Sequence, residues 1–167
     1  HFSLAGMNLN QETAGYVKTE DCPSGQEAYE DETCAKSNPF PEAYRDAQAF
    51  RSFLRMQRSL SDGATLTVTP YLRTNDMEFL MHFLPGQAVE ENEHTSIGAQ
   101  ISYARNSDRV SYVVGFDGEL TNGELTEIQT QTATPFFHTF NYLVGTHYDY
   151  EVDAATFAPY VHAVWHL

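Results

Sequence analysis

Residues 97–116 read IGAQISYARNSDRVSYVVGF and decide the fold class of the chain. Every second residue from Ile97 to Tyr103 is apolar, the alternation repeats from Val110 to Phe116, and a polar turn at residues 106–108 separates the two segments. Alternate side chains of an extended strand point to opposite faces. The stretch therefore predicts an antiparallel hairpin with one apolar face and one polar face.

The same alternation extends over most of the chain. Further strands are predicted at residues 47–60, 65–72, 148–152 and 157–167, with a partial seventh strand in residues 1–9. In residues 65–83 the apolar positions are even-numbered up to Leu72 and odd-numbered from Met77 to Phe83. Because one inserted residue reverses the two faces of a strand, this change predicts a β-bulge around residues 73–76.

The predicted connections are short at one end of the strands and long at the other. Short turns are expected near residues 62, 107 and 154, and long connections at residues 10–46, 74–94 and 121–144. Compact domains seldom contain several long structureless loops. Outer-membrane barrels combine short periplasmic turns with long extracellular loops. We therefore expect an all-β fold, an antiparallel up-and-down transmembrane β-barrel.

Alternation alone leaves open which face of the strands is inside. Aromatic residues end several apolar faces, as the interfacial girdles of a membrane barrel require: Phe50, Tyr103, Tyr148 and Trp165. The following polar residues are then predicted to line a wet lumen: Arg51, Arg55, His147, Asp149 and Glu151. The alternative is a small soluble ligand-binding β-barrel, in which Leu54, Val114 and Val161 point into a closed interior.

Composition excludes some classes of protein. The formal net charge of −14 argues against a nucleic-acid partner, since phosphate binding needs clustered Lys and Arg. No apolar run reaches the roughly 18 residues of a membrane-spanning helix. Cys22 and Cys34 suit a loop disulfide in an oxidising compartment, with two unrelated free thiols as the alternative. Two cysteines alone do not build a zinc site.

Several strings resemble the barrel region of TonB-dependent outer-membrane receptors. They are NLNQETAGYV (8–17), NPFPEAYRD (38–46), TPYLRTNDMEFLMHFLPGQ (69–87), GELTEIQTQ (123–131) and GTHYDYEVDAATFAPYV (145–161). The resemblance implies a barrel of about 22 strands around a plug domain, in the outer membrane of a Gram-negative cell. It also implies uptake of a scarce nutrient such as a ferric siderophore, with energy delivered by a periplasmic TonB protein.

The chain shows no plug-like region and no energy-coupling segment. We therefore expect residues 1–167 to be a partial barrel domain, about seven strands of a larger wall, in contact with outer-membrane lipid. The implied partners are the plug domain, the TonB protein and a small-molecule ligand such as a metal chelate.

Candidate site residues lie in the predicted connection 74–94. A mixed acidic and aromatic surface there is expected to help capture the substrate, through Asp76, His82, Glu90, Glu91 and His94. The alternative is a loop that packs its own aromatic side chains and solvates its acids. His162 and His166 lie about 13 Å apart on one strand, too far to share a metal ion. We expect no cofactor and no enzymatic activity, and an outer-membrane hydrolase is the third alternative.

Overall fold

The computed structural model describes residues 1–13, 15, 17, 22, 32–134 and 142–166. In these residues the chain forms one antiparallel sheet, with a one-turn α-helix and a short 3-10 helix outside it. The elements are β1 (Phe2–Glu12), α1 (Glu32–Ala35), β2 (Tyr44–Leu54), β3 (Met56–Ser59), η2 (Ser61–Gly63), β4 (Ala64–Met81), β5 (Ala88–Asn106), β6 (Val110–Gln129) and β7 (Gly145–Trp165). The predicted all-β class is confirmed.

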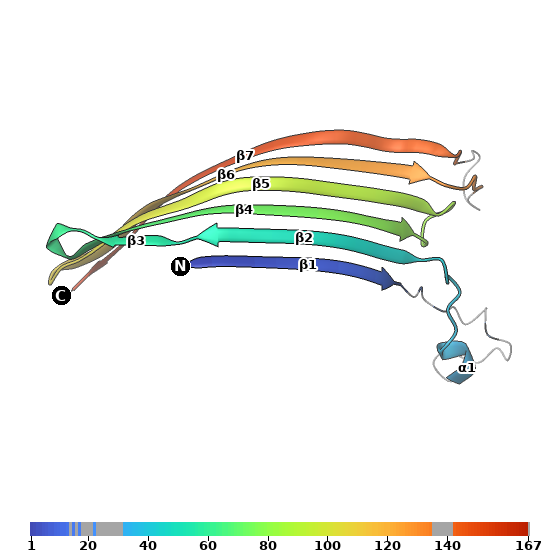
Figure 1. The fold of residues 1–167 in the computed structure, drawn as a ribbon, viewed down its shortest axis with the longest axis horizontal. Coiled ribbons are helices and arrows are strands. Elements are labelled where there is room, and N and C mark those ends of the chain that lie inside the picture. Colours follow the sequence, from blue (N-terminus) through green and yellow to red (C-terminus); the bar gives the residue numbers. More distant parts are fainter. Residues whose placement is uncertain (14, 16, 18–21, 23–31, 135–141, 167) are drawn as a thin grey trace.

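Neighbouring strands follow the order β1-β2-β4-β5-β6-β7, and β3 continues the line of β2 beside β4 (Figure 1). Residues 60–63 and 107–109 make short turns at one end of the sheet, which we call the turn end. Residues 13–43, 82–87 and 130–144 connect the strands at the opposite end, which we call the loop end. The sheet is open, with β1 and β7 at its two edges.

The connection predicted at residues 74–94 is wrong. β4 runs to Met81 and β5 begins at Ala88, so only residues 82–87 leave the sheet. The backbones of residues 74–81 and 88–95 are paired in register across the two strands. Acidic side chains do not prevent this pairing, because they project from the sheet while the backbone makes the ladder hydrogen bonds.

The turn predicted near residue 154 is also wrong. β7 is continuous from Gly145 to Trp165, and Ala154 and Ala155 pair with Thr121 and Leu120 of β6. The bulge predicted around residues 73–76 is absent, since the β4–β5 register continues through it without a shift. Both errors arose because the apolar residues change faces along one uninterrupted strand.

The strand predicted at residues 47–60 is split into β2 and β3. Its register against β4 is the same on both sides of the split, but pairing lapses between Phe53 and Met56. Pro70 of β4 would lie opposite this gap, and proline has no N–H to donate to a ladder. The second in-strand proline, Pro159, pairs with Phe116 on β7, the outermost strand of the described sheet.

Candidate functional site

The register of the sheet assigns each side chain to one of two faces, because directly paired residues of antiparallel strands lie on the same face. Leu72 pairs with Ile97, Ile97 with Leu120, and Leu120 with Ala155. We call their side the Leu72 face. We call a line of directly paired residues across the strands a row. The next row contains Arg73 and lies on the opposite side of the sheet, which we call the Arg73 face.

The Leu72 face is apolar toward the turn end. We call this region the apolar band; its large members are Phe2, Leu4, Leu54, Met56, Leu66, Val68, Leu72, Ile97, Ile101, Tyr103, Tyr112, Val114, Phe116, Leu120, Phe157, Val161 and Trp165. It runs from Val110 to Leu120 on β6 and from Ala155 to Trp165 on β7, about 11 residues on each strand. Arg58 and Arg105 share this face near the turn end.

Several large side chains of the apolar band are highly exposed. Ile97 is 62% exposed and Val161 is 72% exposed. Ser96, the neighbour of Ile97 on the Arg73 face, is 0% exposed. A sheet in a water-soluble domain has the opposite arrangement, with its apolar face covered. Exposed apolar surface of this extent marks a contact with lipid or with another protein.

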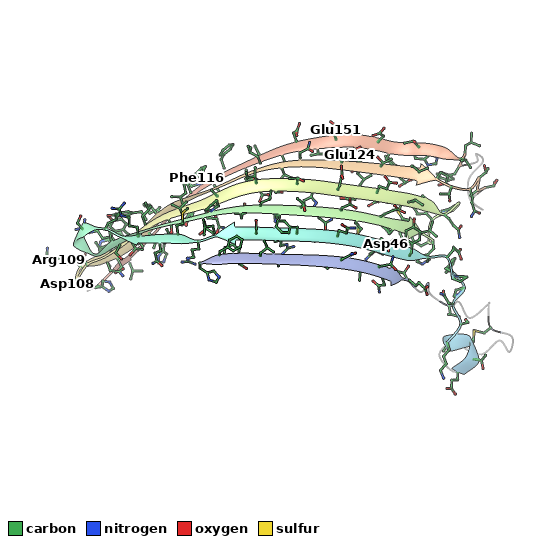
Figure 2. All side chains as sticks on the ribbon, in the orientation of Figure 1. Asp46, Asp108, Arg109, Phe116, Glu124 and Glu151 are labelled. Atoms are coloured by element: carbon green, nitrogen blue, oxygen red, sulfur yellow. A yellow bond between two sulfur atoms is a disulfide. The ribbon has the colours of Figure 1, made fainter. Side chains whose placement is uncertain are left out.

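The Leu72 face becomes acidic toward the loop end. This acidic band consists of Asp46, Asp76, Glu78, Glu91, Glu93, Glu124, Asp149, Glu151 and Asp153, and the described residues place no Lys or Arg among them. Glu93, Glu124 and Glu151 stand side by side on three adjacent strands. Figure 2 shows Asp46, Glu124 and Glu151 toward the loop end, and Phe116 nearer the turn end. Like charges in direct opposition repel, so this band needs water or counter-ions around it.

No metal site forms in the acidic band of the described chain. A shallow cavity of about 300 Å³ is lined by Asp76, Glu78, Glu91, Glu93 and Glu124, among others. Nevertheless, no group of three or more His, Cys, Asp or Glu side chains in the described residues is arranged to hold a metal ion.

The Arg73 face is polar toward the turn end and carries a hydrogen-bonded cluster at mid-strand. The Arg73 Nη2 atom lies 2.6 Å from Glu119 Oε1, and the Tyr71 hydroxyl donates to Glu119 Oε2 at 2.7 Å. Thr121 donates to Glu119 Oε1 at 3.1 Å, and its hydroxyl is 2.7 Å from that of Ser96. The cluster ties β4 to β6 across β5 and fixes the Glu119 carboxylate in place.

The Arg73 face becomes apolar toward the loop end. Its residues there include Met7, Leu9, Ala47, Met77, Phe79, Leu125, Tyr150 and Val152. Each face therefore changes character along the strands, and the two changes are opposite in sense. This inversion explains why the apolar positions of β4 are even-numbered at its start and odd-numbered at its end.

Two tyrosines cover glycines on the Arg73 face. The ring and hydroxyl of Tyr71 lie where a Cβ on Gly98 would project, and Tyr160 covers Gly115 in the same way. Each glycine is on the strand next to its tyrosine. The sequence contained a signal for this feature, since both tyrosines follow a proline, but sequence reasoning did not identify Tyr71, Gly98 or Glu119 as a unit.

The residues predicted to capture a substrate do not form one surface. Asp76 and Glu91 lie on the Leu72 face, whereas Glu90 and His94 lie on the Arg73 face. Only His82 is in a connection, where its ring centroid is 4.8 Å from that of Phe40. The prediction of a shared capture loop is wrong because four of the five residues alternate along paired strands.

The residues predicted to line a lumen are divided as well. Arg51 and Arg55 share the Arg73 face with the polar cluster. Asp149 and Glu151 lie on the opposite face, within the acidic band, so the predicted residues do not share one face. His147 lies at the one register shift between β6 and β7, where its Nδ1 atom is 3.9 Å from Glu127 Oε1.

The aromatic residues predicted to form girdles are also divided. Phe50, Tyr103 and Trp165 lie on the Leu72 face. Tyr148 lies on the Arg73 face, opposite Glu127, so the four aromatic residues do not share one face. The even positions of β7 carry Tyr148, Tyr150 and Val152 toward the loop end, whereas the odd positions there are acidic.

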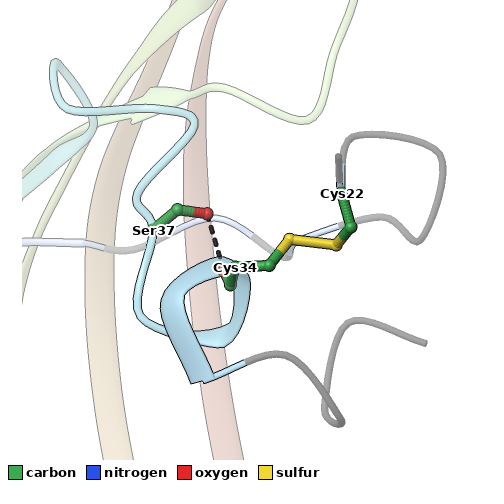
Figure 3. Close-up of a disulfide and its surroundings, with 3 residues drawn as sticks. All are labelled: Cys22, Cys34 and Ser37. Carbon is green, nitrogen blue, oxygen red and sulfur yellow. Dashed lines mark hydrogen bonds between the residues drawn. A yellow bond between two sulfur atoms is a disulfide. The ribbon is translucent and has the colours of Figure 1, made fainter. Parts of the chain in front are cut away.

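The loop end carries a disulfide and a perturbed tyrosine. Cys22 and Cys34 are joined with a Cα–Cα distance of 5.7 Å, and the Ser37 hydroxyl donates to the Cys34 carbonyl at 2.7 Å (Figure 3). Burial, together with the hydrogen bond from the Tyr44 hydroxyl to Glu78, raises the pKa of Tyr44 to about 12. The Tyr44 hydroxyl therefore remains a donor to this carboxylate at physiological pH.

Comparisons with protein-family models, with curated proteins and with solved structures find no match to this chain. In the described part of the chain, no helix has the length and apolar character needed to cross a membrane. The two-faced sheet is therefore the feature from which function must be argued.

Proposed function

We propose that this sheet is part of the wall of an outer-membrane transport barrel of the TonB-dependent receptor type. The observation that carries the proposal is the exposed apolar band opposite a polar face. A transmembrane strand tilted by about 45° needs about 9–11 residues to cross the hydrocarbon. The band has this length on β6 and β7. In this arrangement the band contacts lipid and the Arg73 face lines an aqueous lumen.

The inversion of the faces supports the same arrangement. Outside the hydrocarbon layer the outer surface of a barrel contacts water, and the acidic band on the Leu72 face could be hydrated there. The Arg73 face at that height is apolar, which suits contact with material inside the barrel. Arg105, near the turn end of β5, would lie at the opposite membrane surface, where a long cationic side chain reaches the headgroups.

The open sheet supports a large barrel rather than a small one. β1 and β7 lie at opposite edges, and backbone groups in hydrocarbon must be paired, so further strands are required on both sides. Barrel diameter grows with strand number, and barrels of about 22 strands are transporters with a plugged lumen. A small soluble barrel fits less well, because Leu54, Val114 and Val161 are exposed on an uncovered face.

The proposed activity follows from this barrel type and from the five sequence segments that resemble TonB-dependent receptors. The intact protein would be an active transporter and receptor for a scarce nutrient such as a ferric siderophore, not an enzyme. Its partners would be outer-membrane lipid, a plug domain in the lumen and a periplasmic TonB protein. Its location would be the outer membrane of a Gram-negative cell.

Neighbouring positions on β7 provide a matched test of the proposal. Single cysteines replace Phe157 and Val161 of the apolar band, Ala158 and His162 of the opposite face, and Glu151 of the acidic band. Each is labelled with bimane in the intact protein, which is then reconstituted into vesicles of brominated lipid. We expect quenching at Phe157→Cys and Val161→Cys, and little quenching at the other three sites. Equal quenching at Phe157→Cys and Ala158→Cys would refute the lipid-facing band.

A further inference from the structure

The Arg73 face presents two arginines that have no acidic partner. Arg51 is on β2 and Arg55 follows its last residue, and both are exposed. In the described part of the chain neither forms a salt bridge or a side-chain hydrogen bond. Arg73 lies directly opposite Arg51, so that three cations gather on this side of the sheet. The like charges oppose one another unless an anion joins them.

The nearby acids do not neutralise these two arginines. The Glu119 carboxylate accepts hydrogen bonds from Tyr71, Arg73 and Thr121. Asp117 is half-buried, and its Oδ1 atom is buried without a hydrogen-bond partner. The charges that remain accessible at mid-strand are therefore the guanidinium groups of Arg51 and Arg55.

This arrangement is unexpected in a chain whose formal net charge is −14. The sheet separates its charges, with the acidic band on the Leu72 face and unpaired arginines on the Arg73 face. The rows next to the arginines supply hydroxyl and amide groups from Thr65, Thr67, Thr69, Gln100 and Ser102. The large apolar side chains in these rows on β2 and β4 are Phe53, which lies between the two arginines, and its partner Tyr71. Protein interfaces need a larger cluster of apolar anchors, so the surface fits a hydrated solute better than a protein partner.

We propose that Arg51 and Arg55 bind the oxyanion groups of a solute that carries two or more negative charges. This inference rests on the proposed function, because it requires the Arg73 face to line a water-filled lumen. Guanidinium groups bind carboxylates, sulfonates and phosphates through paired N–H donors. The two Cα atoms are about 13 Å apart along the strand, and the long side chains can converge on one extended anion.

The test uses the fluorescent trisulfonate pyranine as the probe and the purified intact protein in non-ionic detergent at low ionic strength. Fluorescence anisotropy gives the dissociation constant for the wild type, for R51Q/R55Q and for R58Q/R105Q. The second double variant removes the same charge from the Leu72 face and is the matched control. We expect binding to weaken about tenfold in R51Q/R55Q and to change by less than about twofold in the control.

Three outcomes would overturn the inference: no pyranine binding by the wild type, unchanged binding in R51Q/R55Q, or equal weakening in both double variants. Heat-modifiable migration in gels shows whether each variant retains the barrel. A folded R51Q/R55Q barrel with unchanged binding would refute the anion site alone. Failure of the proposed function is detected separately, by the lipid-quenching pattern at Phe157 and Ala158.

Discussion

Tyr71 shows how single residues hold a one-layer sheet together. Its ring covers Gly98 on the neighbouring strand, and its hydroxyl donates to Glu119 one strand further on. Gly98 is required here because a Cβ would meet both the Tyr71 ring and the Gly118 carbonyl oxygen, the latter at 2.8 Å. The tyrosine thus replaces part of the packing that a second layer gives in other sheets.

Gly98→Ala should destabilise the folded protein by about 1–3 kcal/mol, as overpacking does elsewhere. The added methyl group displaces Tyr71 and breaks its bond to Glu119. Gly123→Ala is the control on the same face, because its Cβ would meet Glu93 O at 3.4 Å and His94 Cβ at 3.5 Å, which are tolerable contacts. Urea unfolding of each variant in lipid vesicles measures its free energy of unfolding. Equal stability of the two variants would contradict the role of Tyr71.

Sequence reasoning succeeded for some residues and failed for others for one reason. The register confirms that Arg51 lies on the face opposite Phe50 and Leu54. Asp149 and Glu151 do not share the face of Arg51, because the apolar residues beside them, Tyr148 and Tyr150, belong to the Arg73 face at that end of β7. The periodicity of a strand shows which residues share a face, but it does not show what each face contacts.

At the scale of the element, β7 combines two opposite amphipathic patterns in one strand. Its odd positions are acidic from Asp149 to Asp153 and mainly apolar from Phe157 to Trp165. A local pattern predicts a turn between these halves, since most strands keep one buried side. No turn forms because β6 pairs with β7 along both halves. The residue pattern of β7 alone does not reveal this pairing. The hairpin at residues 97–116 was predicted correctly because it lies within one half.

An arginine at the centre of the apolar band should be costly only on the lipid side. Val161→Arg should destabilise the folded protein by about 2–4 kcal/mol, the range for Arg at the midplane of a lipid-facing strand. His162→Arg, one residue along and on the other face, should change stability by much less. Urea titration of the protein folded in vesicles gives both values. Similar losses in the two variants would contradict the assignment of the faces.

At the scale of the whole molecule, the proposed transport activity predicts a growth phenotype. Cells that lack the intact protein should grow more slowly than the parent strain on at least one iron(III) chelate from a panel. A protonophore should abolish uptake of that chelate in the parent, because import depends on the energised inner membrane. A vector carrying the intact gene is the control for the deletion. Identical uptake in both strains, or uptake that resists the protonophore, would contradict active transport.

In the proposed barrel, the inverted faces would also determine how deeply the sheet inserts into the membrane. If the sheet moved inward by two residues along each strand, Asp153 would enter the hydrocarbon and Arg105 would leave the opposite headgroups. Each buried charge would cost about 2–4 kcal/mol, and a shift in the other direction would draw Arg105 into the hydrocarbon. In the proposed barrel, the carboxylates on the loop side and Arg105 on the turn side would therefore set the depth of the sheet in the membrane.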